Sequence, residues 1–122
     1  MHALVVDDSK TVRAILSAYL KGFGFAVTEA VNGRDGFDRL KQMDQPDLVL
    51  VDWNMPHTDG ISFIREVRAD GGYDDLPVVM VTTNTELSQV SRALDAGASE
   101  YLMKPCTKDM VREKLELLGF TV

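Results

Sequence analysis

Four short apolar runs in this chain each end on a polar residue. The runs are rich in Val and Leu and do not alternate with polar residues, which is typical of strands covered on both faces, as in a parallel sheet. They occupy residues 3–6, 48–51, 78–81 and 101–103. Parallel strands end at the same edge of their sheet, and open α/β sheets bind ligands in the crevice at that edge. We therefore expect the polar residues that follow the runs to meet in one site.

The polar groups after these runs are three carboxylates, a hydroxyl and an ammonium group. They belong to Asp7, Asp8, Asp52, Thr82 and Lys104. Two carboxylates about 5 Å apart repel by roughly 3 kcal/mol at an effective dielectric constant of about 20, so a cation must hold them together. Mg²⁺ prefers such hard oxygen ligands, and an ammonium group suits phosphoryl oxygens. The combination predicts a site for a divalent cation and a phosphoryl group.

Helical patterns separate the apolar runs. Apolar residues recur at helical spacing in residues 12–20, 36–43, 61–67, 90–94 and 110–118. The predicted core-facing stripes include Ile15 and Leu94, and a weaker strand is expected over residues 23–29. Gly22 and Gly97 are expected to end the first and fourth helices, and Thr107 to cap the last one. Alternating strands and helices with right-handed crossovers predict an α/β, doubly wound, three-layer sandwich.

Length and composition narrow the classes of protein that fit. A chain of 122 residues supports one core, and we expect residues 1–122 to form a single domain. With 13 basic and 19 acidic residues the net charge is −6, which argues against a nucleic-acid or membrane surface. The single cysteine, Cys106, excludes an internal disulfide and suits the cytoplasm. The first run begins after Met1-His2, so we expect no signal peptide.

An ordered set of motifs resembles the response-regulator receiver domain. The set consists of Asp7-Asp8, Asp52 within DWNMP, Gly60, Thr82 and Lys104-Pro105. No single piece is specific, but all of them in this order and spacing are, and the resemblance covers the whole chain. It implies a flavodoxin-like (βα)5 fold with the parallel sheet order 2-1-3-4-5. It also implies a single, stand-alone receiver domain of the chemotaxis kind.

The resemblance assigns a phosphorylation site to this chain. Asp52 would accept a phosphoryl group from a sensor histidine kinase, with its carboxylate as the nucleophile. Asp8, Asp52 and the backbone carbonyl of Asn54 would coordinate Mg²⁺ directly, and Asp7 would act through water. Thr82 and Lys104 would contact the phosphoryl oxygens. The chain would thus catalyse its own phosphorylation and dephosphorylation without being an enzyme for another substrate.

The resemblance also implies how the signal is read and how long it lasts. Pro105 would follow a cis peptide bond, and Tyr101 would be the switch residue, turning inward when Thr82 moves towards the phosphoryl group. The output face, made by the fourth helix, fifth strand and fifth helix, would include Val90, Tyr101, Met103 and Lys114. Three residues would tune the lifetime of the phosphoryl group, namely Asn54, Thr83 and Asn84.

Thr83 departs from the family pattern, which usually has Gly, Ala or Ser there, and its methyl group could narrow access to the site. A chemotaxis member of the family carries an acid where Asn84 stands, so that member's phosphate lifetime does not transfer to this chain.

The functional interpretation is therefore a cytoplasmic, monomeric switch of a two-component system. Its partners would be a histidine kinase and a downstream protein, and whether a phosphatase is a further partner is left open. The leading role is control of the flagellar motor in chemotaxis. A phosphorelay intermediate, or the receiver domain of a larger transcriptional regulator, is the alternative. Two other classes fit less well. A dehalogenase-type phosphatase needs a second Asp where Asn54 stands, and a flavodoxin would place its phosphate on carboxylates.

Overall fold

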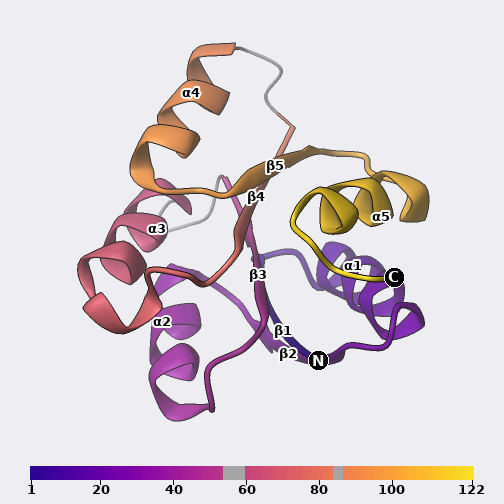
Figure 1. Cartoon of the computed structure of the whole chain (residues 1–122), viewed down its shortest axis with the longest axis horizontal. Helices are drawn as coiled ribbons and strands as arrows, with labels where there is room; N and C mark the ends of the chain where they lie inside the picture. The colour runs from indigo at the N-terminus through magenta and orange to yellow at the C-terminus, as the bar shows by residue number, and fades with distance from the viewer. Residues whose placement is uncertain (54–59, 84–86) are drawn as a thin grey trace.

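The structure is a computed structural model that describes residues 1–53, 60–83 and 87–122. Five parallel strands form one sheet in the order β2-β1-β3-β4-β5 (Figure 1). The strands are β1 (His2–Val6), β2 (Ala26–Ala30), β3 (Leu48–Asp52), β4 (Val78–Thr82) and β5 (Glu100–Met103). The strand order and the parallel pairing confirm the predicted fold class.

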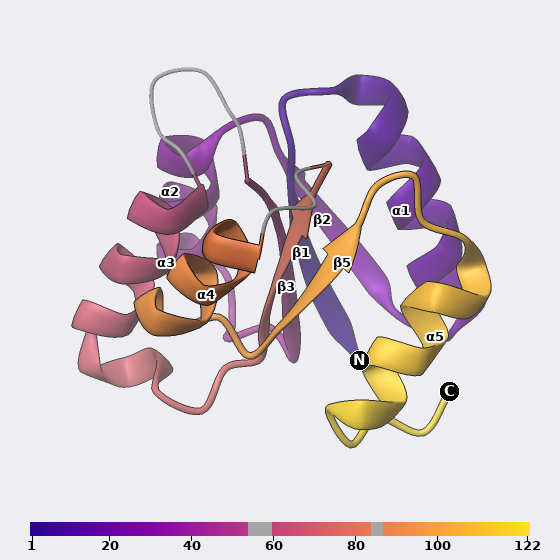
Figure 2. The ribbon, with the colours of Figure 1, turned by 90° about the horizontal axis from the view of Figure 1, so that it is seen from above.

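Helices cover both faces of this sheet. They are α1 (Lys10–Gly22), α2 (Gly33–Gln42), α3 (Gly60–Ala69), α4 (Leu87–Ala96) and α5 (Lys108–Leu117), and a short 3₁₀ helix, η1 (Gly71–Tyr73), follows α3. Figures 1 and 2 show α1 and α5 on one face and α2, α3 and α4 on the other. The three layers agree with the predicted sandwich.

The sheet separates two hydrophobic cores, because the side chains of each strand alternate between its faces. In β1, Leu4 and Val6 belong to the core beneath α2, α3 and α4, whereas Ala3 and Val5 belong to the core beneath α1 and α5. Every residue of β3 and β4 is buried, which explains why the sequence there does not alternate. β2 lies at the edge of the sheet and is partly exposed, so its apolar pattern is weaker.

The helix ends largely follow the predicted signals. Thr107 caps α5, where its hydroxyl accepts a hydrogen bond from the Met110 N–H at 3.2 Å. α1 ends at Gly22, and Gly97 follows α4 with a φ of 116°, a conformation that favours glycine. Among the described helices, none combines the length and the apolar character that a membrane crossing needs.

Two predicted core contacts are wrong. Ile15 and Leu94 are 45% and 44% exposed, although both fit an apolar helical spacing. Each has a buried neighbour in sequence, Leu16 on α1 and Ala93 on α4. Successive residues of a helix point about 100° apart, so only one residue of each pair can face the sheet squarely. The stripes on α1 and α4 are therefore narrower than the sequence pattern predicted.

The parallel register aligns the carboxyl ends of four strands. The pairs nearest that edge are Val6–Val51, Asp52–Val81 and Thr82–Met103. The backbone pairing continues one residue further, because the Trp53 N–H donates to the Val81 carbonyl at 2.8 Å and the Lys104 N–H donates to the Thr82 carbonyl at 2.7 Å. The residues that end or follow these strands are consequently held at one edge of the sheet.

Gly60 begins α3 directly against the end of β3. Its N–H donates to the Trp53 carbonyl at 3.0 Å. A Cβ atom at this position would lie 2.4 Å from the carbonyl oxygen of Asp52 and 3.0 Å from Met80 Sδ. The first of these atoms is backbone in a buried strand and cannot move aside without moving Asp52. Glycine therefore allows α3 to approach the functional edge of the sheet.

We expect Gly60→Ala to lower the free energy of unfolding by about 2 kcal/mol, because the added methyl group overpacks the end of β3. Gly71→Ala is the matched control, since a Cβ atom added at Gly71 would meet no other atom within 4 Å. Its effect should stay within about 0.5 kcal/mol. Urea denaturation of the two variants and the wild type measures the difference. Equal stabilities of the two variants would contradict the close approach at Gly60.

Candidate functional site

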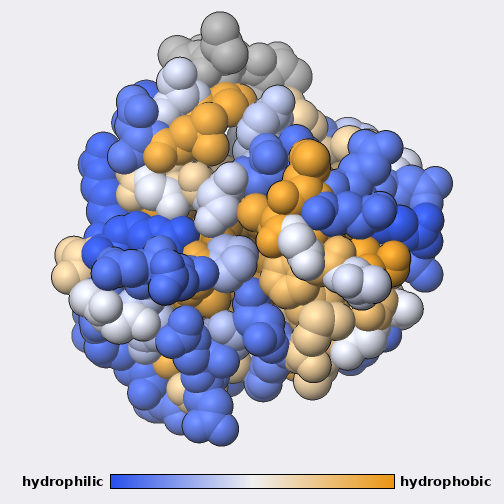
Figure 3. Space-filling view, in the orientation of Figure 1, coloured by the Kyte–Doolittle hydropathy of each residue, from blue (hydrophilic) through white to orange (hydrophobic). Residues whose placement is uncertain are grey.

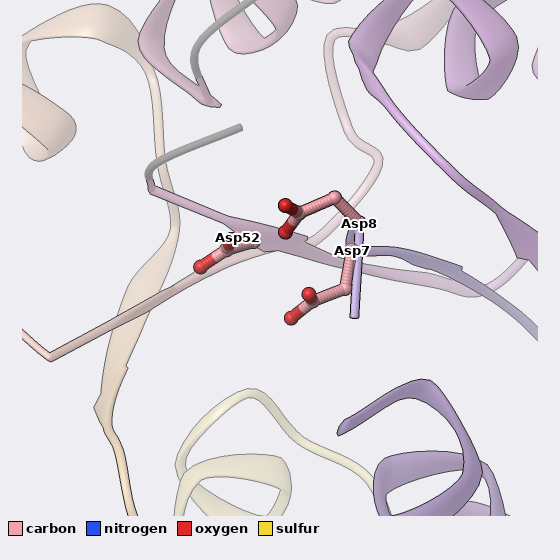
Figure 4. A group of neighbouring side chains, drawn as sticks. All are labelled: Asp7, Asp8 and Asp52. Atoms are coloured by element: carbon pink, nitrogen blue, oxygen red, sulfur yellow. The ribbon is translucent and has the colours of Figure 1, made fainter. Parts of the chain in front are cut away.

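Three carboxylates converge at the carboxyl edge of the sheet (Figure 4). Asp7 and Asp8 follow β1, and Asp52 is the last residue of β3. One carboxylate oxygen from each residue lies within 4.8 Å of the other two. Asp7 and Asp52 are only 1% and 6% exposed, whereas Asp8 is open to solvent. The structure thus brings together the three acidic residues that the sequence places at separate strand ends.

Lys104 joins two of these carboxylates. Its Nζ donates hydrogen bonds to Asp7 Oδ2 and to Asp52 Oδ1, both at 3.0 Å. The lysine side chain is 17% exposed, so its ammonium group is largely shielded from water. The Lys104–Pro105 peptide bond is cis, as the resemblance implied. The charge-assisted bonds compensate part of the negative charge that the fold gathers here.

Burial and neighbouring charges shift the pKa values within this site. Loss of solvation raises the pKa of Asp52. The hydrogen bond from Lys104 lowers it, and the charges of Asp7 and Asp8 raise it again, so that the pKa lies above its ordinary value. Burial lowers the pKa of Lys104, but the hydrogen bonds to Asp52 and Asp7 and the charges of these two carboxylates together outweigh burial and raise it overall. An isolated ion pair would lower the Asp52 pKa, so its upward shift reflects burial together with the crowding of negative charge.

The donor set of the site fits a hard divalent cation. Only one ammonium group, which contacts two of the three carboxylates, accompanies the cluster, so negative charge is left uncompensated when all four groups are ionised. Carboxylate oxygens are the ligands that Mg²⁺ prefers, and Mg²⁺ usually keeps several water molecules, which the exposed Asp8 permits. The cluster contains neither histidine nor cysteine among the described residues, so it offers little to softer metals.

Thr82 and Thr83 lie next to this charged group. Thr82 ends β4, is 3% exposed, and accepts the Lys104 backbone N–H through its carbonyl. Thr83 is exposed and, with Lys104 and Pro105, lines a surface hollow of about 480 Å³ whose opposite wall is the apolar side of α1. Thr83 therefore stands beside the site, and the narrowing of access by its methyl group stays a prediction.

The predicted switch and output residues lie around β5. Lys114 Nζ, from α5, is 4.4 Å from the ring centroid of Tyr101 and 3.1 Å from Glu100 Oε1. A cation over an aromatic face is attracted by the ring, so this cation–π contact packs α5 against β5 at Tyr101. Val90 on α4 and Met103 in β5 are half-buried. Two further predicted residues, Asn54 and Asn84, lie outside the described residues, and their roles stay predictions.

Several contacts around the site were not predicted. The Ser9 N–H donates to Asp7 Oδ1 at 2.9 Å, and its N-cap position before α1 was a readable signal. Arg92 on α4 places its guanidinium carbon 5.7 Å from the ring centroid of Trp53. Glu100 and Trp53 acquire their partners from remote helices, so no local spacing in the sequence points to these pairs.

Known proteins resemble this chain along most of its length. The family model described as response regulator receiver domain matches residues 3–116. A chemotaxis protein of Campylobacter jejuni subsp. jejuni (strain 81-176), a CheY homolog, is 40% identical over 117 residues, which are 95% of this chain and 90% of that protein.

Two solved structures share the fold closely. The chemotaxis response regulator CheY4 of Vibrio cholerae is 30% identical with a TM-score of 0.89, and the match covers 96% of this chain and 97% of that one. A probable two-component system response regulator/GGDEF domain protein is also 30% identical, with a TM-score of 0.90, and the match covers 97% of this chain but 48% of that one. The same fold therefore occurs both alone and as part of longer chains.

We expect Asp52→Asn to be more stable than the wild type at neutral pH when no metal is bound. The native state binds the Asp52 proton more tightly than the unfolded chain does, since its native pKa lies above the ordinary value of 3.8. The wild type should therefore lose stability, relative to the variant, as pH rises through 3.8 to the native pKa. Above the native pKa, the difference in unfolding free energy between the variant and the wild type reaches its maximum. Well below pH 3.8 this difference vanishes, because Asp52 is protonated in both the native and the unfolded state.

Urea denaturation in EDTA between about pH 3 and about pH 8 measures this gap. A gap that does not change with pH, or a variant less stable than the wild type at neutral pH, would contradict the raised pKa of Asp52.

Proposed function

Because the chain belongs to the response regulator receiver domain family of two-component systems, we propose that it is a switch whose Asp52 accepts a phosphoryl group from a sensor histidine kinase. The observation that carries this proposal is the setting of Asp52. Its carboxylate is buried, lies beside those of Asp7 and Asp8, and accepts a hydrogen bond from Lys104 Nζ at 3.0 Å. A nucleophile, a fixed cation and a set of metal ligands thus share one edge of the sheet.

The proposed transfer exchanges one bond at phosphorus for another. A carboxylate oxygen of Asp52 forms a bond to the phosphorus atom, while the bond from phosphorus to the kinase histidine nitrogen breaks and its electron pair stays on that nitrogen. Positioning and charge stabilisation supply most of the catalysis in such transfers. Lys104 can turn its ammonium group from Asp52 to the phosphoryl oxygens, and the Thr82 hydroxyl can donate to one of them.

Mg²⁺ is the cofactor that this proposal requires. Asp8 and Asp52 would hold it directly and Asp7 through water, together with the Asn54 carbonyl that the resemblance implies. When bound, it neutralises charge on the carboxylates and on the transferred group. The chain acts only on its own phosphoryl group, so we propose a self-modifying switch and not an enzyme. Asn54, Thr83 and Asn84 would tune the lifetime of the phosphorylated state.

The downstream protein would recognise the phosphorylated state at the face formed by α4, β5 and α5. Thr82 pairs with Met103 of the neighbouring strand, so these two side chains point to the same face of the sheet. Tyr101 lies two residues before Met103 in β5, and its side chain therefore points to that face as well. Movement of Thr82 towards the phosphoryl group would let the Tyr101 ring turn inward, which is a local charge event that biases a packing equilibrium. Figure 3 shows apolar patches over α4 and beside α5, as a protein-binding face would have.

For the downstream partner we propose the flagellar motor switch. The relative from Campylobacter jejuni and the structure from Vibrio cholerae are both chemotaxis proteins, which supports this role. The net charge of −6 argues against direct contact with nucleic acid. We further propose that the protein acts as a monomer in the cytoplasm.

A second candidate has an observation of its own. The response regulator/GGDEF domain protein carries a closely similar receiver within a longer chain. The same geometry would therefore serve a receiver that controls an attached output domain, or an intermediate that passes its phosphoryl group on.

We expect acetyl phosphate to phosphorylate the purified protein at Asp52, and only when Mg²⁺ is present. Intact-mass spectrometry measures the modification. Asp52→Asn should abolish it, because the proposed nucleophile is lost and the other carboxylate bonded to Lys104, that of Asp7, already has its second oxygen engaged by the Ser9 N–H. Asp47→Asn is the matched control, since Asp47 is an exposed carboxylate just before β3, and it should label like the wild type. Labelling of Asp52→Asn at the wild-type rate would refute the proposal.

We expect beryllofluoride loading to tighten binding to a purified flagellar motor switch protein by about tenfold. Lys114→Ala should weaken the loaded complex, because Lys114 lies on the output face over Tyr101. Lys41→Ala, a charge-matched change on α2, should not. Surface plasmon resonance measures the affinities. Equal binding with and without beryllofluoride, in protein shown to carry it, would favour the second candidate.

A further inference from the structure

We propose that Arg13 is a positioning residue that holds the peptide group between Asp7 and Asp8 and thereby aims the Asp8 carboxylate at the metal site. The inference rests on the proposed function, because it concerns the binding of Mg²⁺. It assigns a role to a side chain that touches neither the phosphoryl group nor the metal.

Arg13 is fixed between two strands. Its side chain, from the first turn of α1, is 12% exposed. Nη1 donates to the backbone carbonyl oxygen of Asp7 at 2.7 Å, and Nε donates to Glu29 Oε1 of β2 at 3.1 Å. The planar guanidinium group thus uses two of its donors in fixed directions, as its fork geometry allows. Glu29 is 43% exposed, so this pair orients the arginine more than it stabilises the fold.

The carbonyl that Arg13 holds belongs to the peptide linking Asp7 to Asp8. Because a peptide group is planar, fixing its oxygen also fixes the direction in which the chain enters Asp8. On the other side of Asp8, the Ser9 N–H donates to Asp7 Oδ1 at 2.9 Å. Asp8 is therefore held by hydrogen bonds on both of its flanks.

Asp8 needs this external support because its side chain is exposed. Its carboxylate has no hydrogen-bond partner within the described part of the chain. Asp7 and Asp52, by contrast, are fixed directly by Lys104. The backbone on either side of Asp8 consequently decides where its oxygens lie relative to the other two carboxylates.

Positioning and simple charge predict opposite results for removal of Arg13. A cation near the acidic cluster repels an incoming Mg²⁺, so loss of charge alone would tighten metal binding. Loss of positioning would weaken it, since groups that orient metal ligands are typically worth about tenfold or more in affinity. The sign of the change therefore separates the two roles.

The test is a calorimetric Mg²⁺ titration of the full chain and its variants. We expect Arg13→Gln to bind Mg²⁺ about tenfold more weakly than the wild type. Arg13→Lys keeps the charge but cannot reach both the Asp7 carbonyl and Glu29, so its affinity should be intermediate. Arg39→Gln removes the same charge from an exposed ion pair with Asp35 on α2, and it should bind as the wild type does.

Unfolding free energies of all four proteins, measured in EDTA, identify any variant that does not fold. If Arg13→Gln proves unfolded, Arg13→Lys decides, because its charge is unchanged. Affinity equal to or tighter than that of the wild type, in a folded Arg13 variant, overturns the inference. Absence of Mg²⁺ binding by the wild type would instead overturn the proposed function.

Discussion

The crowding of three carboxylates at one edge of the sheet, two of them bonded to one ammonium group, is the interaction on which the rest of the site depends. Asp7 and Asp52 are buried, so they cannot rely on water and are held by Lys104 at 3.0 Å. The charge that Lys104 does not compensate suits the edge to a divalent cation and, with burial, raises the pKa of Asp52. Buried, crowded charges of this kind are typical of functional sites, where they shift pKa values.

The backbone around this edge keeps the carboxylates close despite their repulsion. The parallel register fixes β1 against β3, and Gly60 lets α3 begin directly against Asp52. Arg13 and Ser9 hold the chain on either side of Asp8. Each of these supports is a hydrogen bond or a close contact that involves the main chain, so the geometry of the site is set largely by the fold itself.

The sequence predicted the elements and the edge where they meet, but not the side chains that orient the site. Asp7, Asp52 and Lys104 could be found because apolar runs mark buried strands, and parallel strands end together. Ile15 was misplaced because helical spacing gives the direction of a stripe and not its width. The Arg13–Glu29 pair was missed, since it joins a helix to a strand through tertiary packing that no periodicity encodes.

The bond between Lys104 and Asp7 joins residues 97 positions apart, and the bond between Lys104 and Asp52 spans 52 positions. Contacts between residues so distant in sequence require the closure of long loops, which costs conformational entropy. A nascent chain that has not yet paired β5 with β4 contains Asp7 and Asp52 but lacks the lysine beside them. The complete set of charged groups is thus confined to chains in which all of these strands have paired.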